Sequence, residues 1–275
     1  MYLNMLYRVE IGKNVNLVKN SFYGCGHLKY ITIPNTATIE TTGSMIFTAC
    51  NSLVALIIPN ISTTLYDYFC TNCWSLSKIS IPKTLYGIGQ NLFNDNMSLT
   101  KITLPKNLAQ TTLTGLFTGC ITLKSVIVPN TIKTLSSGVF QNCKSLQSVQ
   151  LPNSLTDIGY NSFNGCYALA NIDLPNTLTS VGSSAFYNCM SLTSLMIPST
   201  VNAVGSAAFN SCYGLRFIDF SNHTEIPTLA TSAFNSTASD LKIIVPDNLY
   251  EDWIASTNWA NYASKIIKKT DWDAL

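Results

Sequence analysis

The sequence predicts an α/β fold, a right-handed solenoid of about eleven coils of about 23 residues each, with one parallel β-sheet face and a C-terminal helical cap. Three observations support this prediction. Phenylalanines recur at intervals of 22 to 25 residues, prolines keep the same step, and a cysteine occupies one shared position in nearly every unit. Three series with one common phase indicate repeated coils that stack on one another. The series are Phe22, Phe47, Phe69, Phe93, Phe117, Phe140, Phe163, Phe186, Phe209 and Phe234; Pro34, Pro59, Pro82, Pro105, Pro129, Pro152, Pro175 and Pro198; and Cys25, Cys50, Cys73, Cys120, Cys143, Cys166, Cys189 and Cys212, with Asn96 at the skipped cysteine position.

Each unit divides into a strand and a return. Residues 146–151 of one representative unit end in an alternation of apolar and polar side chains, which is typical of a short strand. Pro152 ends the strand because it has no N–H group to donate. The apolar residues that follow have helix-like spacing interrupted by Gly159, which predicts an irregular or short helical return. Counting from residues 6–11 to residues 241–245 gives about eleven candidate strands, expected to lie in parallel about 4.8 Å apart.

One strand and one return per unit is the pattern of a leucine-rich repeat. The recurring motif L-x-x-I-x-I-P, followed by I-x-x-I-G-x-x-A-F-x-x-C, resembles the BspA-like leucine-rich repeat proteins of bacterial and some protist surfaces. The resemblance covers nearly the whole chain. It implies adhesion at a cell surface, with host matrix proteins or other microbes as partners. The sequence departs from the motif at Ile46-Phe47, Leu116-Phe117, Asn96 and Phe220-Ser221, and in the longer coil from Leu215 to Phe234.

The chain is predicted to have two parts, a solenoid over residues 1–245 and a helical cap with a tail over residues 246–275. A solenoid needs such a cap because its open apolar end would otherwise aggregate. We expect Asp247 to be the N-cap of a helix that buries Trp253, and a second short helix to hold Trp259. The alternative is that these two tryptophans form a sugar-stacking pair.

Composition excludes several classes of partner. Charged residues make up 11% of the chain, and the net charge of +2 comes from lysines scattered one or two per repeat, so we expect no nucleic-acid partner. No apolar stretch approaches the ~18 residues of a membrane span, so we expect no membrane insertion within this chain. The first residues contain no visible signal peptide. A cell-surface or secreted location follows from the resemblance, with a cytoplasmic location as the alternative.

The reactive side chains form no pattern that is typical of an enzyme's active site. Eight of the nine cysteines share one repeat position, which predicts buried, unreactive free thiols, with disulfides between adjacent coils as the minority alternative. The pair Cys70 and Cys73 lacks the second ligand pair of a zinc site. His27 and His223 are expected in surface loops, and Trp272 in a loose tail. We therefore expect no catalytic, cofactor-binding or metal-binding residues.

The outward positions of the predicted strands are where a partner could bind. Most of them carry small polar side chains, but Met196 and Phe217 are large and apolar and lie on neighbouring coils, with Asp173 and Asp219 nearby. An exposed apolar pair with a polar rim is typical of an interaction site. We predict a noncatalytic module that binds a protein or glycoprotein through these four residues, with an intracellular scaffold or regulator as the alternative. A glycan-active enzyme is least favoured, because Asp173 and Asp219 are predicted roughly 10 Å apart.

Overall fold

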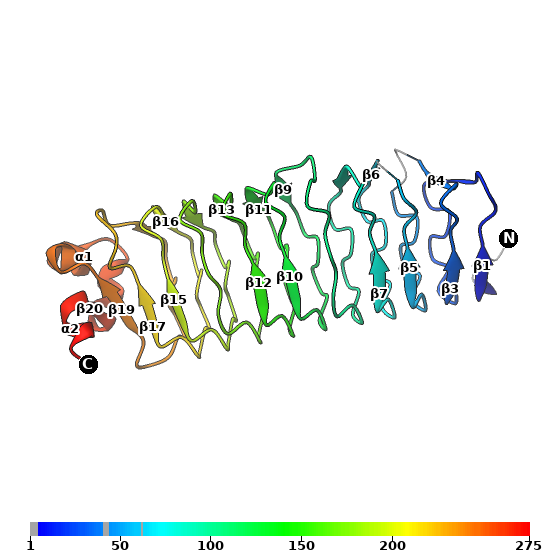
Figure 1. Ribbon diagram of the computed structural model, residues 1–275. Helices are drawn as coiled ribbons and strands as arrows, with labels where there is room; N and C mark the ends of the chain where they lie inside the picture. The colour runs from blue at the N-terminus through cyan, green and yellow to red at the C-terminus, as the bar shows by residue number, and fades with distance from the viewer. Residues whose placement is uncertain (1–4, 41–43, 62) are drawn as a thin grey trace.

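Short parallel strands stack along the length of the molecule and form what we call the front ladder (Figure 1). The computed structural model describes residues 5–40, 44–61 and 63–275, so the expectation about the N-terminus falls partly on residues 1–4, outside the described residues. Each coil runs from one front strand through a return to the next, which confirms the predicted solenoid. The front strands are β1 (Arg8–Glu10), β3 (Tyr30–Thr32), β5 (Ala55–Ile57), β7 (Lys78–Ser80), β10 (Ser125–Ile127), β12 (Ser148–Gln150), β15 (Ser194–Met196), β17 (Phe217–Asp219), β19 (Lys242–Val245) and β20 (Ile266–Lys268).

The front ladder is interrupted. In the described part of the chain its hydrogen bonds join β1 with β3, β5 with β7, β10 with β12, and β15 with β17, β19 and β20. Residues 101–103 and 171–173 lie at predicted strand positions but form no strand, and Lys101 makes only an isolated bridge to Ser125. The strand prediction is therefore wrong at these two coils.

The returns form a second parallel ladder, where the sequence predicted irregular or short helical segments. Each strand of this return ladder has only two residues, and β13, for example, pairs with β11 and β14. A paired run of two residues leaves no alternating pattern in the sequence, which is why it was missed. The return strands are β2 (Asn16–Leu17), β4 (Thr38–Ile39), β6 (Thr64–Leu65), β8 (Gly87–Ile88), β9 (Thr112–Leu113), β11 (Thr134–Leu135), β13 (Asp157–Ile158), β14 (Ser180–Val181), β16 (Ala203–Val204) and β18 (Thr228–Leu229).

Phenylalanine rings stack through the interior. From Phe93 to Phe234, neighbouring ring centroids lie 5.1 to 5.9 Å apart and the planes are tilted by at most 18°. Every ring in this run is buried. A single coil could not bury such a ring, so the stacking of coils is itself the core.

The cysteines form a second interior column. The thiol of Cys166 donates to the carbonyl oxygen of Phe140 at 3.2 Å, and Cys189 does the same to Phe163 at 3.2 Å. All nine cysteines are buried and free, so the adjacent-coil disulfides do not form in this structure. Burial raises the pKa of the Cys212 thiol to about 12. Since the thiolate is the reactive form, this favours the predicted low reactivity.

The ring column is interrupted at the coil of Phe69. The N–H of Cys70 donates to the carbonyl of Leu92 at 3.1 Å, just as the N–H of Phe93 donates to Leu116 at 3.1 Å. Cys70 therefore occupies the ring position, and Phe69 lies one residue earlier, where the next coils have leucine. The placement of Phe69 in the ring series was wrong by one residue. No ring contact joins Phe69 to Phe93 in the described structure.

The cysteine column changes at the next coil. Asn96 is fully buried in the cysteine position, as predicted. Its side-chain oxygen accepts the N–H of Cys73 at 3.0 Å, and its amide nitrogen lies 3.7 Å from the sulfur of Cys70. The two unusual residues, Cys70 and Asn96, are thus neighbours.

Both ladders are also interrupted between these coils, at a boundary between residues 69–92 and 93–116 that we call the seam. The return strand β8 does not pair with β9. Instead, the side-chain amide of Gln110 accepts the N–H of Ile88 at 3.3 Å and donates to its carbonyl at 2.8 Å. On the front, residues 101–103 form no ladder with β7. The seam therefore affects both ladders and both interior columns, while backbone hydrogen bonds such as that from the N–H of Asn72 to the carbonyl of Asn94 still join the two coils.

Two buried tryptophans close the C-terminal end. The rings of Trp253 and Trp259 lie 5.2 Å apart, and Trp259 also packs 5.2 Å from Phe220 and 5.9 Å from Phe234. The indole N–H of Trp259 donates to the Pro227 carbonyl at 2.8 Å. Both rings are buried, so the capping interpretation is confirmed and the sugar-stacking alternative is wrong. The helices of this end are η2 (Asp247–Leu249), α1 (Tyr250–Ala255), η3 (Trp259–Lys265) and α2 (Lys269–Asp273).

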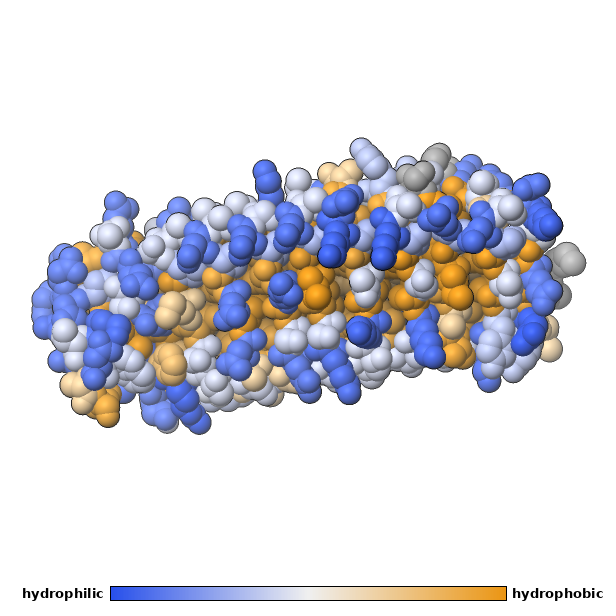
Figure 2. Space-filling view, in the orientation of Figure 1, coloured by the Kyte–Doolittle hydropathy of each residue, from blue (hydrophilic) through white to orange (hydrophobic). Residues whose placement is uncertain are grey.

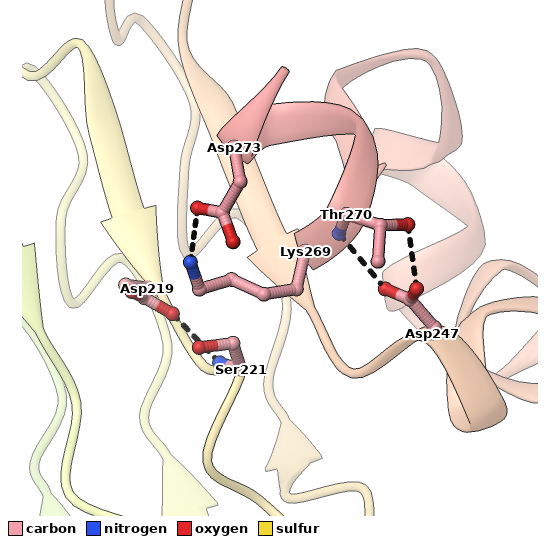
Figure 3. Close-up of polar contacts among 6 residues, drawn as sticks. All are labelled: Asp219, Ser221, Asp247, Lys269, Thr270 and Asp273. Carbon is pink, nitrogen blue, oxygen red and sulfur yellow. Dashed lines mark hydrogen bonds and ion pairs between the residues drawn. The ribbon is translucent and has the colours of Figure 1, made fainter. Parts of the chain in front are cut away.

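The end of the chain differs from the prediction at two residues. Strand β20 continues the front ladder beside β19 and carries α2 back over it, so Trp272 does not lie in a loose tail. Its ring packs 5.2 Å from Phe217. Asp247 is not the N-cap of its own helix, because its carboxylate accepts hydrogen bonds from the N–H and hydroxyl of Thr270 in α2 (Figure 3).

His223 is buried, although the sequence predicted a surface loop. Only 4% of its surface is exposed, and its ring packs against Phe220 and Trp253. The two ring nitrogens face the carbonyl oxygens of Phe220 and Val201 at 3.0 and 3.2 Å. The tryptophan that encloses His223 is distant in sequence, so local pattern alone could not place it.

Candidate functional site

The front ladder presents a long face with an apolar band between two hydrophilic rims (Figure 2). Outward strand positions mostly carry small side chains, such as Ser125, Ser148 and Ser194. Because these side chains cover little area, apolar residues contribute to the lining of the hollows on this face. Any partner of the front ladder would meet both kinds of surface.

One hollow contains three of the four predicted site residues. It has a volume of about 640 Å³ and lies where residues 171–173 leave the ladder, and we call it the Asp173 hollow. Asp173, Met196 and Phe217 line it together. Met196 projects from β15 and is 62% exposed, whereas Phe217 on β17 is half-buried. The arrangement offers apolar contacts beside an exposed carboxylate.

Asp219, the fourth predicted residue, does not line this hollow. Its carboxylate accepts the backbone N–H of Ser221 at 2.7 Å, which holds it at the end of β17 (Figure 3). The nearby ion pair between Lys269 and Asp273 belongs to α2. Asp219 therefore shapes the turn after β17.

Helix α2 forms the C-terminal side of this region. Trp272 packs on Phe217, and Asp247 fixes the first turn of α2 through Thr270. These hydrogen bonds hold the pKa of the Asp247 carboxyl below its ordinary value of 3.8. The position of Phe217 thus depends on the docking of the last helix, a contact that the sequence did not reveal.

The reactive side chains of the described residues are mostly buried or far from one another. Within residues 5–40, 44–61 and 63–275, no group of three or more His, Cys, Asp or Glu side chains could hold a metal ion. The thiols are buried, burial raises the pKa of Cys143, for example, and burial lowers the pKa of His223, whose ring is enclosed. His27 is exposed, as predicted.

A second hollow on the front face was not predicted. It has a volume of about 520 Å³, lies at the seam, and is lined by Lys78, Lys83 and Lys101. An adjoining smaller hollow is lined by Lys101 and Lys106. We call these two together the lysine hollow. The lysines are scattered along the sequence, and they share columns only when the coils are aligned by repeat position.

Comparison with protein families decides the identity of the repeat. The family model described as the BspA type leucine rich repeat region matches residues 15–147 and 133–251, with six copies. The chain belongs to this BspA-type leucine-rich repeat family. A comparison with curated proteins returned no match.

Solved structures of other leucine-rich repeat proteins have the same fold. A leucine-rich repeat protein from Bacteroides ovatus is 27% identical over 90% of this BspA-type chain, with a TM-score of 0.78, and the match covers 65% of that protein. The chain therefore spans less than two thirds of that relative. A leucine-rich cell surface protein from Faecalibacterium prausnitzii is 23% identical, with a TM-score of 0.52, over 94% of this chain and 76% of the other. None of the helices among the described residues has the length and apolar character to cross a membrane.

Proposed function

We propose that this chain is a noncatalytic protein-binding module whose partner docks on the front ladder at the Asp173 hollow. The observation that carries the proposal is the exposed Met196 beside Phe217 in a hollow with the carboxylate of Asp173 on its rim. Apolar anchors surrounded by polar groups are the usual centre of a protein interface. The elongated BspA-type solenoid adds a continuous surface on either side.

The partner is a protein or glycoprotein of a host matrix or of another cell, and the module is displayed at a cell surface. Membership in the BspA-type family supports this location, as does the structural likeness to a protein described as a cell surface protein. The free thiols favour a second candidate, an intracellular scaffold or regulator, because extracellular proteins more often pair their cysteines.

Binding to immobilised extracellular-matrix glycoproteins tests the proposal. The double variant Met196→Ser with Phe217→Ser should weaken the affinity of any matrix protein that binds the unchanged chain by about tenfold or more, measured by surface plasmon resonance. Tyr160→Ser is the matched control, because Tyr160 is 56% exposed but belongs to a return and not to the front ladder. Equal affinities of the double variant and the unchanged chain would remove the Asp173 hollow as the docking site. Binding to none of the matrix glycoproteins would argue against the adhesion role.

A further inference from the structure

The lysines of the lysine hollow recur in two repeat columns at the same two coils. Lys78 and Lys101 occupy the first outward strand position, and Lys83 and Lys106 follow the prolines that end those strands. In the next two coils the same columns carry Ser125 and Ser148, and Asn130 and Asn153. All four lysines are exposed. Two independent columns therefore place lysine on the same pair of coils.

This pair of coils is also one of the places where the solenoid departs from its own pattern. The front ladder, the return ladder, the ring column and the cysteine column all change at the seam. Departures from local folding rules tend to gather at functional sites, because a functional gain can outweigh the stability that such a departure costs. The lysines thus coincide with a second, independent irregularity.

The charge around the lysine hollow is one-sided. Residues 68–156 contain seven lysines and one acidic residue, Asp95, a net charge of +6 in a chain whose total is +2. No carboxylate lines either part of the hollow, and the ion pairs found among the described residues involve Arg216 and Lys269. Like charges on neighbouring coils repel each other, and Lys78 and Lys101 line the same hollow. Folding alone therefore does not explain the lysine pairs, whereas an anionic partner does.

The floor of the hollow indicates which anion fits. Ile81, Ile102 and Leu104 lie between the two lysine pairs, with the hydroxyls of Ser80 and Thr103 on the same coils. A partner therefore needs charges at its two ends and an apolar middle, with the ends up to about 16 Å apart at the rise of an extended strand. Nucleic acids and sulfated glycans carry charge along their whole length, and no aromatic side chain lines the hollow to stack a base.

We infer that the lysine hollow binds an acidic segment of a partner protein, in which carboxylates flank one or more apolar side chains. The inference rests on the proposed protein-binding function but concerns a different part of the front ladder. Lys78 and Lys101 bind one cluster of carboxylates, and Lys83 and Lys106 bind the other. The apolar side chains of the segment contact Ile81 and the exposed Ile127, which lines the smaller part of the hollow.

Fluorescence anisotropy with a labelled synthetic peptide tests this inference on the full chain. The peptide carries an Asp-Glu pair on each side of a Leu-Thr-Leu core, and its control carries Asn-Gln pairs instead. The acidic peptide should bind, and its affinity should fall with rising salt, while the amide peptide should bind at least about tenfold more weakly. A Lys78→Gln, Lys83→Gln, Lys101→Gln, Lys106→Gln variant should lose about tenfold or more in affinity for the acidic peptide.

A variant with Lys124→Gln, Lys133→Gln and Lys144→Gln is the control for positive charge in the same region; it removes three charges where the hollow variant removes four, and none of these lysines lines the hollow. It should retain most of the affinity. Equal losses in the two variants, or equal binding of the amide peptide, would overturn the inference. Tighter binding of heparin or of a DNA oligonucleotide, abolished by the hollow variant, would also overturn it in favour of a polyanion. Because the peptide is assayed directly, a negative result here leaves the matrix-binding test of the Asp173 hollow unaffected.

Discussion

Residues 117–209 and the seam use the same repeat in different ways. In residues 117–209, rings stack on rings, thiols donate to the preceding coil, and the return strands pair without a break. At the seam, Cys70 replaces a ring, Asn96 replaces a thiol, and Gln110 replaces a strand pairing. At the seam, side chains of Asn96 and Gln110 make hydrogen bonds at the positions where the regular coils use thiols and paired strands.

This difference shows that a substitution in one coil depends on the residues of the adjacent coil. Asn96 is satisfied only because Cys73 offers an N–H group and Cys70 a sulfur in the preceding coil. A buried amide without such partners would cost free energy. A change in one coil is therefore tolerated when the adjacent coil changes with it, and such paired changes gather at one boundary.

The largest effect is expected from removing rings. Phe163→Ala should lower the free energy of unfolding by about 3–5 kcal/mol, because it leaves a cavity between two stacked neighbours. Phe93→Ala should cost about 1 kcal/mol less, because among the described aromatic rings Phe93 stacks on Phe117 alone, whereas Phe163 stacks on two rings. Urea denaturation followed by circular dichroism measures both. Equal losses would mean that ring stacking does not distinguish the two regions.

A smaller effect is expected at the cysteine position. Asn96→Ala should cost about 1–3 kcal/mol, because the buried N–H of Cys73 loses its acceptor. Cys166→Ala should cost about 1 kcal/mol, because it removes a weak thiol donor and little volume. The same denaturation experiment ranks the two variants, and a larger loss for Cys166→Ala would contradict the assigned role of Asn96.

Mild acid should destabilise the C-terminal end, which contains His223, whereas residues 117–209 contain no histidine. Burial lowers the pKa of His223 below its ordinary value of 6.5. Below pH 6.5 the unfolded chain binds a proton on His223 more readily than the folded chain does. The contribution of His223 to stability is therefore fully present above pH 6.5 and is lost as the pH falls from that value toward the lower pKa of the folded state. The melting temperature of His223→Gln should vary less with pH in this window. A parallel pH dependence in the variant and the unchanged chain would refute this explanation.

The smallest effect is expected at the lysine pairs. Lys101→Ser introduces the residue found in the next two coils and removes repulsion from Lys78. It should raise the free energy of unfolding by about 0.2–1 kcal/mol at low salt, the range for exposed charge pairs, and by less at high salt. Lys133→Ser serves as the control, because Lys133 lies outside both hollows. An unchanged free energy of unfolding in Lys101→Ser would mean that these lysines do not oppose folding.

The sequence was sufficient for the parts of the fold that repeat. The intervals between phenylalanines, prolines and cysteines predict stacked coils, buried thiols and a capped end, and the structure has all three. The shift at Phe69 was missed because its cysteine was assumed to follow by three residues, while Cys73 follows by four. Counting back from Leu76, which opens the next strand segment, would have identified Cys70 as the ring position.

Other features depend on contacts that no local pattern encodes. His223 is buried by Trp253, and Trp272 is held by Phe217 across the end of the front ladder. Three of the four predicted site residues line one hollow. Their neighbourhood could be predicted because the spacing of the strands can be counted from the sequence. The lysine hollow was missed because its charges are close in space only when successive coils are superimposed.

The stacking of coils in residues 117–209 also fixes the distance along the molecule that each coil adds. The main part of the lysine hollow lies before this section, and the Asp173 hollow begins within it and extends past its end to Phe217. Each coil inserted between them would separate the two hollows by roughly a further 5 Å without altering either lining. Duplication of a single unit could therefore adjust the span between two attachment points in fixed increments, which is a simple route to matching partners of different length.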